Sequence, residues 1–146
     1  MSLPALSPAV PLQAGIFTRL TGDATLMALI DGVFDGVPED VDGDYVTIDE
    51  SIESPDNVHS EFGSITLWTL RIWTKARGHL TGLQIEARIR VLLDHQHVAL
   101  DALVEGHTVV MAKFESRLAL VDPEPPGDTR HVPVTYRFST EQDPTS

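Results

Sequence analysis

The chain contains no cysteine among its 146 residues. This absence excludes a disulfide-stapled scaffold, a thiolate zinc site and a cysteine nucleophile. A chain of this length can bury a hydrophobic core without such help. The composition therefore favours one globular domain that is held together by packing.

Long hydrophobic runs are missing as well. No apolar run approaches the roughly 18 residues that a membrane-spanning helix needs. Residues 1–13 are apolar, but three prolines interrupt them and no basic residue precedes them, so they do not form a signal peptide. We therefore expect a soluble protein without a membrane partner, folded in a cytoplasm.

Positive charge is scarce, since 10 Lys and Arg stand against 22 Asp and Glu and the net charge is −12. Affinity for nucleic acid comes mainly from Lys and Arg on phosphates, so the sequence argues against DNA or RNA as a specifically bound partner. The charge is also spread unevenly. Residues 1–66 hold twelve acidic residues and one basic residue, whereas residues 67–146 hold ten acidic and nine basic residues.

This uneven charge has two interpretations. Exposed charge keeps a protein soluble in any case. It also suits a contact in which the acidic half of one copy meets the basic segment of the next, and head-to-tail contacts of this type can close into rings. Under the second interpretation, five basic residues are candidates for the contact between subunits: Arg71, Lys75, Arg77, Arg88 and Arg90.

The signatures of common catalytic sites do not occur. The sequence has no G-x-S-x-G elbow, H-E-x-x-H, Walker lysine or G-x-G-x-x-G. The acidic residues 39–44 lack an EF-hand's first ligand, because Pro38 stands at that position. His95 and His97 supply two imidazoles without a further zinc ligand at a suitable spacing. We predict no catalytic, metal or cofactor site.

Hydrophobic periodicity predicts an α+β fold. Helical spacing of apolar residues predicts three helices, over residues 12–20, 24–30 and 80–94. Alternation predicts four strands, over residues 45–51, 64–74, 109–121 and 131–139. Residues 51–63 read as a long loop, and the proline-rich residues 122–128 read as a turn between two strands. The expected architecture is a single mostly antiparallel sheet of about four strands, packed with two to three helices.

Two details of this prediction concern which side chains are buried. In the helix over residues 80–94, Leu80, Leu83, Ala87, Ile89 and Val91 are expected to form the buried stripe, which Ile85, Leu92 and Leu93 broaden. Trp68 and Trp73 lie five residues apart on one strand and are expected on opposite faces of the sheet. The expected division of the chain is a proline-rich segment over residues 1–11, one domain over residues 12–139 and a flexible tail over residues 140–146.

Three stretches together carry a resemblance to a known family. They are residues 12–24 continuing to 33–40, residues 67–75 leading into the helix at 80–93, and residues 130–138 after a Pro, Gly and Asp turn. Their order resembles the tail-terminator, or tail-completion, proteins of long-tailed phages and related gene-transfer particles. The resemblance covers roughly residues 12–139.

The resemblance implies a non-catalytic subunit of a hexameric ring at the junction of tail and neck in a virion. Such a ring caps the last ring of the major tail tube protein, ends tail elongation, and offers a joining surface to the connector of the filled head. The resemblance makes the tube below a second candidate partner of the five basic residues. DNA passes through the ring without specific binding, so we expect acidic side chains to face the channel and repel phosphate. The candidates for this lining are Glu39, Asp40, Asp42, Asp44, Glu53 and Asp56.

Two other functions stay open on the sequence. One is a connector or stopper protein of the neck, which belongs to the same particle. The other is a cytoplasmic α+β ligand-binding domain, or an enzyme of unrecognised type.

Overall fold

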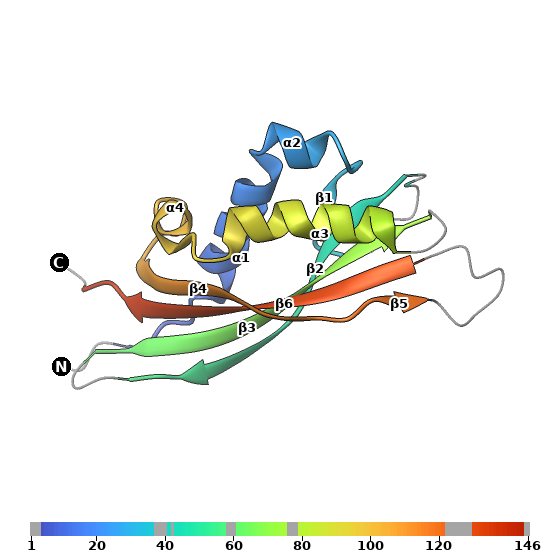
Figure 1. The fold of residues 1–146 in the computed structure, drawn as a ribbon. Coiled ribbons are helices and arrows are strands. Elements are labelled where there is room, and N and C mark those ends of the chain that lie inside the picture. The colour runs from blue at the N-terminus through green and yellow to red at the C-terminus, as the bar shows by residue number, and fades with distance from the viewer. Residues whose placement is uncertain are drawn as a thin grey trace.

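The described strands form one mixed sheet, and the described helices lie on one of its faces (Figure 1). The computed structural model describes residues 4–36, 41, 43–57, 61–75, 79–121 and 130–144. In chain order the elements are α1 (Ala9–Thr21), α2 (Ala24–Met27), β1 (Val33–Phe34), β2 (Tyr45–Pro55), β3 (Gly63–Thr74), α3 (Leu80–Leu93), α4 (His97–Asp101), β4 (His107–Arg117), β5 (Leu120–Val121) and β6 (Arg130–Gln142). The predicted α+β class is confirmed.

The strand order is β1-β2-β3-β6-β4, with β5 paired to β6. All pairs are antiparallel except β1 with β2, so the prediction of a mostly antiparallel sheet is confirmed. The sheet has six strands where about four were predicted. Residues 33–34 add β1, and the predicted strand over residues 109–121 is interrupted after Arg117, which separates β4 from β5.

Two stretches predicted to be irregular are strand instead. Residues 51–55, predicted as loop, continue β2, with Ser51 opposite Trp68 and Pro55 opposite Ser64. Ser51, Glu53, Ser54 and Pro55 are typical of a loop, and they occur here because this part of β2 is exposed along its whole length. At the other end of the chain, β6 runs to Gln142, past the predicted limit of 139, because Gln142 N–H donates to the Phe62 carbonyl oxygen over 2.8 Å.

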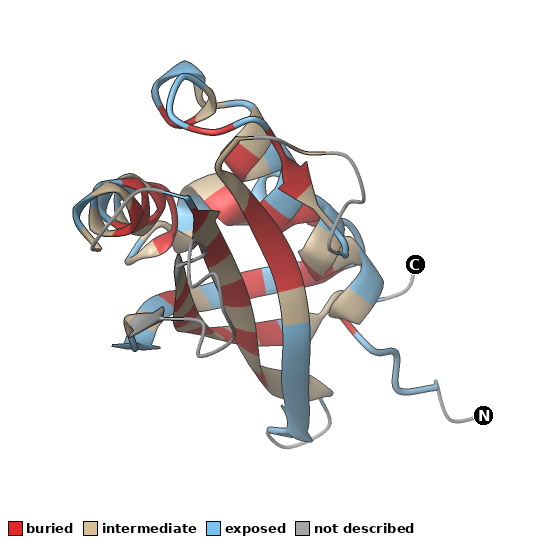
Figure 2. Cartoon of the chain, turned by 90° about the vertical axis from the view of Figure 1, so that its right-hand side faces the viewer, coloured by how far each residue is buried: buried red, intermediate tan, exposed pale blue. Residues whose placement is uncertain are grey.

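The core lies between the helices and the inward side of the sheet (Figure 2). Inward positions alternate along β6, where Val132, Val134, Tyr136 and Phe138 are all buried. In the described part of the chain four helices cover them, where two to three were predicted. Residues that face the core from α1 and α3 include Leu12, Ile16, Leu20, Ile85, Ile89, Leu92 and Leu93. Trp68 is buried in this core and Trp73 is not, so the predicted opposite placement of the two tryptophans is confirmed.

Helix α3 is apolar on two sides, and the predicted buried stripe is wrong for most of its members. Of the predicted five, only Ile89 is buried, whereas Leu80 and Val91 are 69% and 57% exposed and Ala87 is exposed too. The core contact comes from the opposite side of the helix, through Ile85, Leu92 and Leu93 along with Ile89. Because both sides carry apolar residues at helical spacing, periodicity alone could not choose between them.

Backbone groups on the outer edge of β4 are bound by α4 and by the residues between α3 and α4. Val109 N–H donates to Asp101 Oδ1 and Phe114 N–H donates to Asp94 Oδ1, both over 2.8 Å. Between them, His95 N–H donates to the Ala112 carbonyl oxygen over 2.8 Å. An unpaired strand edge is a template for unwanted pairing with another chain, and these three bonds occupy backbone groups along the edge of β4.

Candidate functional site on the open face of the sheet

The face of the sheet that turns away from the helices is called here the open face. On β3 its side chains are Ile65, Leu67, Thr69, Arg71 and Trp73, all of them partly exposed. The register extends them into rows across the neighbouring strands. A solvated antiparallel face usually carries polar side chains, whereas three of these five are large and apolar. The open face therefore has the composition of a contact surface.

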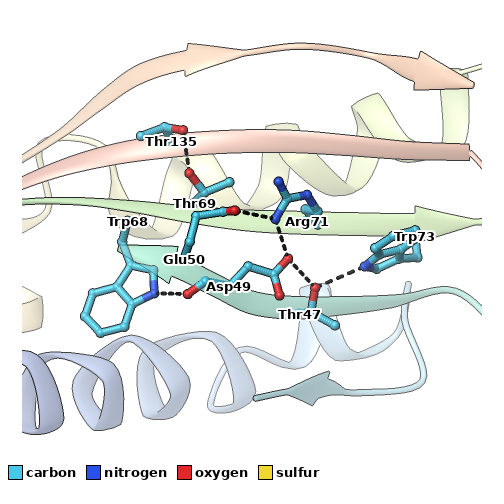
Figure 3. Close-up of polar contacts among 8 residues, drawn as sticks. All are labelled: Thr47, Asp49, Glu50, Trp68, Thr69, Arg71, Trp73 and Thr135. Atoms are coloured by element: carbon cyan, nitrogen blue, oxygen red, sulfur yellow. Dashed lines mark hydrogen bonds and ion pairs between the residues drawn. The ribbon is translucent and has the colours of Figure 1, made fainter. Parts of the chain in front are cut away.

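A β-bulge in β2 places two carboxylates on this face. The pairing with β3 shifts between Ile48 and Ser51, and the two residues of the shift are Asp49 and Glu50. A bulge re-aims side chains and interrupts the ladder of backbone bonds. Here the indole N–H of the buried Trp68 donates to the Asp49 carbonyl oxygen over 3.0 Å, which holds the bulge in place (Figure 3).

Arg71 binds both of these carboxylates from the neighbouring strand (Figure 3). Its Nη1 donates to Asp49 Oδ2 over 3.0 Å and also to the Glu50 carboxylate. Asp49 Oδ2 accepts a second bond from the Thr47 hydroxyl, over 2.9 Å, and that hydroxyl in turn accepts from the Trp73 indole N–H over 3.0 Å. One chain of polar contacts thus joins β2 to β3 on the open face.

These contacts fix the charge of the cluster. The hydrogen bond from Arg71 is the main cause that lowers the pKa of Glu50, against a smaller opposing effect of burial. The same bond raises the pKa of Arg71. Partial burial, and secondly the charge of Asp49, raises the pKa of Tyr45. A carboxylate held ionised by a guanidinium is a poor proton donor near neutral pH, so the cluster suits recognition better than acid catalysis.

Aromatic rings continue the open face toward β1. Phe34 meets Tyr45 edge-on at 6.0 Å between centroids, Tyr45 stacks on Trp73 at 6.2 Å, and Trp73 stacks on His131 at 4.8 Å. These four rings come from four neighbouring strands, β1, β2, β3 and β6. Beside them a shallow hollow of about 560 Å³ is lined by Asp35, Ile48, Asp49, Glu50, Arg71 and Trp73. Its border of charged groups distinguishes it from the mostly apolar pockets that hold small ligands.

The predicted basic residues do not form one patch. Arg71 lies on the open face, whereas Arg88 and Arg90 belong to α3 on the other side of the sheet. Arg88 Nη2 donates to Asp23 Oδ1 over 2.7 Å, and Arg90 Nη2 donates to Glu86 Oε1 over 2.6 Å. Lys75 follows β3, and its backbone N–H donates to Asp44 Oδ1 over 3.1 Å. Arg77 lies outside the described residues.

The predicted acidic residues are divided between the two ends of β2. Asp44 directly precedes the strand, while Glu53 and Asp56 lie near its far end. Eleven residues of strand span roughly 36 Å, so the two ends cannot form one cluster. Glu53 Oε1 accepts a bond from the Ser7 hydroxyl over 2.7 Å. Glu39, Asp40 and Asp42 lie outside the described residues.

Sequence reasoning missed a buried carboxylate that two arginines share. Glu86 is 5% exposed at its side chain, and it pairs with Arg90 and, at 3.8 Å, with Arg117 Nε. Arg90 also lies over the Phe114 ring, 3.7 Å from its centroid. A signal was present in the sequence. Glu86 is the single acidic residue between Arg71 and Arg90, and Arg90 stands at the i+4 position that favours ion pairs in helices.

Neither a metal site nor a membrane-spanning helix is found in the described part of the chain. No group of three His, Cys, Asp or Glu side chains there has the arrangement of a metal site. His97 begins α4, and His95 precedes it in the left-handed region, at φ 58°. None of the described helices is long and apolar enough to cross a bilayer.

Comparison with known proteins identifies a family whose model matches the chain and a solved structure that shares its fold. The family model described as tail completion protein gp17 matches residues 14–141. Among solved structures, a chain in the structure described as the virion of a native gene transfer agent particle has 24% sequence identity and a TM-score of 0.79. The match covers 92% of this chain and 98% of that chain, which shows a shared fold. No curated protein matches the sequence.

Proposed function

Because the chain belongs to the tail completion protein gp17 family, and is thus a structural protein of a phage-like tail, we propose that it is the tail terminator. Six copies form a ring that caps the last ring of the major tail tube protein and ends elongation. The opposite side of the ring joins the connector of the filled head. The family match over residues 14–141 carries this proposal, since it spans nearly every helix and strand.

The surfaces of the subunit support assembly as its activity. The open face exposes apolar side chains beside a charge cluster whose carboxylates are held by Arg71. Such a face suits contact with another protein better than reaction with a substrate. The role does not include catalysis or a cofactor.

We propose that the acidic lining of the channel comes from one end of β2 only. We place Asp44, which directly precedes β2, toward the channel. Carboxylates there would repel the phosphates of passing DNA and keep it from binding. Glu53 and Asp56 lie at the other end of β2 and are free for another role. Replacing Asp44 by Lys should slow DNA delivery while leaving tail length unchanged.

Deletion of the gene, followed by electron microscopy of the tails, tests the proposal. A terminator predicts tails well beyond the normal length, because nothing stops addition of the tube protein. Tails of normal length that fail to join heads would overturn it and would favour a neck connector or stopper. Complementation with the intact gene serves as the control and should restore both length and joining.

A further inference from the structure

The solvent-facing side of α3 carries an apolar stripe beside a groove. Leu80, Ala87 and Val91 follow one another along the helix and are exposed. The groove has a volume of about 620 Å³, and Leu83, Ala87, Val91, Arg90 and Arg117 are among the residues that line it. A helix that is apolar on opposite sides is typically buried on both. The stripe therefore indicates a surface that another chain covers.

The more exposed charged side chains on the border of this groove are cationic. Arg90 and Arg117 are each more than a third exposed, while the Glu86 side chain that they share is only 5% exposed. The neutralising carboxylate thus lies beneath the two guanidinium groups. Asp94 also lines the groove, and its carboxylate accepts the backbone N–H of Phe114. An incoming chain would meet an apolar floor with two arginines beside it.

The far end of β2 has the complementary properties. Residues 50–56 are all exposed, and they contain three acidic residues and no basic one. Glu50 pairs with Arg71, so Glu53 and Asp56 are the two that are not bound by an arginine of the same cluster. Ile52 is 64% exposed and lies opposite Leu67, so it belongs to the open face. This exposed end of β2 stays paired with β3 at the edge of the sheet, and in Figure 2 it lies below the helices.

The chemistry of this end favours contact through side chains. Pro55 has no N–H to donate to a neighbouring strand, and glutamates on an edge discourage strand pairing. The end of β2 is therefore unsuited to extending another sheet. Its exposed Ile52 and Glu53 instead match an apolar groove with a cationic border.

We propose that residues 50–56 of one copy dock in the α3 groove of the next copy. Ile52 packs against Ala87 and Val91, and Glu53 faces Arg90 and Arg117. The two surfaces lie on different sides of one chain, so the contact is head-to-tail and repeats from copy to copy, as a closed ring requires. This inference rests on the proposed ring and names the surfaces that join its subunits.

Engineered disulfides test the contact, because the natural chain has no cysteine. The test variant is Ile52→Cys with Val91→Cys. Within one chain these residues lie on opposite sides of the sheet, so a disulfide between them joins two copies. The matched control is Ile52→Cys with Val98→Cys, since Val98 is 73% exposed on α4 and outside the groove.

The readout is a non-reducing gel of tails oxidised after assembly. The groove pair should give covalent multimers up to the closed ring, and the control pair should stay at the monomer position. Multimers in equal yield from both pairs, or monomer alone from the groove pair, would overturn the contact. If the groove pair gives monomer alone and Val91→Glu still blocks assembly, the groove binds a different virion protein.

A complementation assay separates this inference from the proposed function. Val91→Glu replaces an exposed side chain, so it should leave the melting temperature nearly unchanged. In cells that lack the gene, it should restore at least tenfold fewer normal-length tails than the natural chain. Full restoration by Val91→Glu would refute the contact and leave the terminator function standing. Normal tails in the deletion itself would refute the function.

Discussion

Arg88 holds the carboxylate of Asp23 through two hydrogen bonds, from Nε over 2.8 Å and from Nη2 over 2.7 Å. Asp23 Oδ2 also accepts the Leu26 backbone N–H, so one residue caps α2 and ties it to α3. The hydrogen bonds from Arg88 are the main cause that lowers the pKa of Asp23 to about 2. This pair gives the structure a defined response to acid.

The pair predicts a loss of stability in acid with a known sign. The pKa of Asp23 is lower in the folded chain than its ordinary value of 3.8, so its stabilising effect is present above that value. The effect is lost as pH falls from about 4 to about 2. Asp23→Asn keeps a good N-cap but removes the ion pair. Melting temperatures across this range should fall less steeply for Asp23→Asn than for the natural chain; parallel curves would contradict the assignment.

Removal of Arg71 should leave two carboxylates side by side on the bulge. Arg71→Met is expected to destabilise the fold by about 1 kcal/mol, because the cluster is partly exposed and screened by water. The loss should shrink as pH falls below the ordinary pKa of Glu50, since protonation of Glu50 relieves the repulsion. Urea unfolding at pH 7 and at pH 3.5 measures both effects. An equal loss at the two pH values would show that packing, not charge, dominates.

Gly15 marks the closest approach of α1 to the segment after α4. A Cβ at this position would lie 2.7 Å from Val104 Cγ2 and 3.3 Å from the Leu103 carbonyl oxygen. Gly15→Ala should therefore destabilise by about 1–2 kcal/mol, despite the better helix propensity of alanine. Gly36→Ala is the matched control, because a Cβ there meets nothing within 4 Å. Equal unfolding midpoints for the two variants would refute the close packing.

Asp101 protects the edge of β4. Asp101→Ala leaves the Val109 N–H without its acceptor, which should cost about 1–3 kcal/mol. Hydrogen exchange at the Val109 amide should become faster as well. Asp101→Asn retains a side-chain carbonyl oxygen and should keep most of the protection. Similar exchange rates in the two variants would mean that the carboxylate does not close the edge.

Helices and strands were predicted correctly where the spacing of hydrophobic residues allowed only one arrangement. The alternation along β3 predicted a strand with Trp68 and Trp73 on opposite faces, and a shift by one residue would bury Arg71 in place of Leu70. The prediction of α3 as a helix was correct, but its buried side was not, since Leu80, Ala87 and Val91 imitate a core stripe. A stripe that faces another chain looks the same in sequence as one that faces the core.

Other features depended on distant contacts that no local pattern records. Ile52 and Glu53 were predicted as loop, yet pairing with β3 makes them strand. The short helix α4 lies next to β4, whose Val109 N–H binds the last residue of that helix. The ion pairs were not predicted either, because their partners are far apart in the sequence. Arg88 and Asp23 are 65 positions apart, and Arg71 and Asp49 are 22 positions apart. Counting charged residues along the chain therefore overestimated how many of them lie together in one charged patch.

A cryo-electron microscopy reconstruction of the head-proximal end of the tail tests the central claim most directly. We expect one layer of six copies of this chain above the last ring of tube protein, with residues 50–56 of each copy against α3 of its neighbour. Particles that lack the chain, or that hold it at the other end of the tail, would contradict the account.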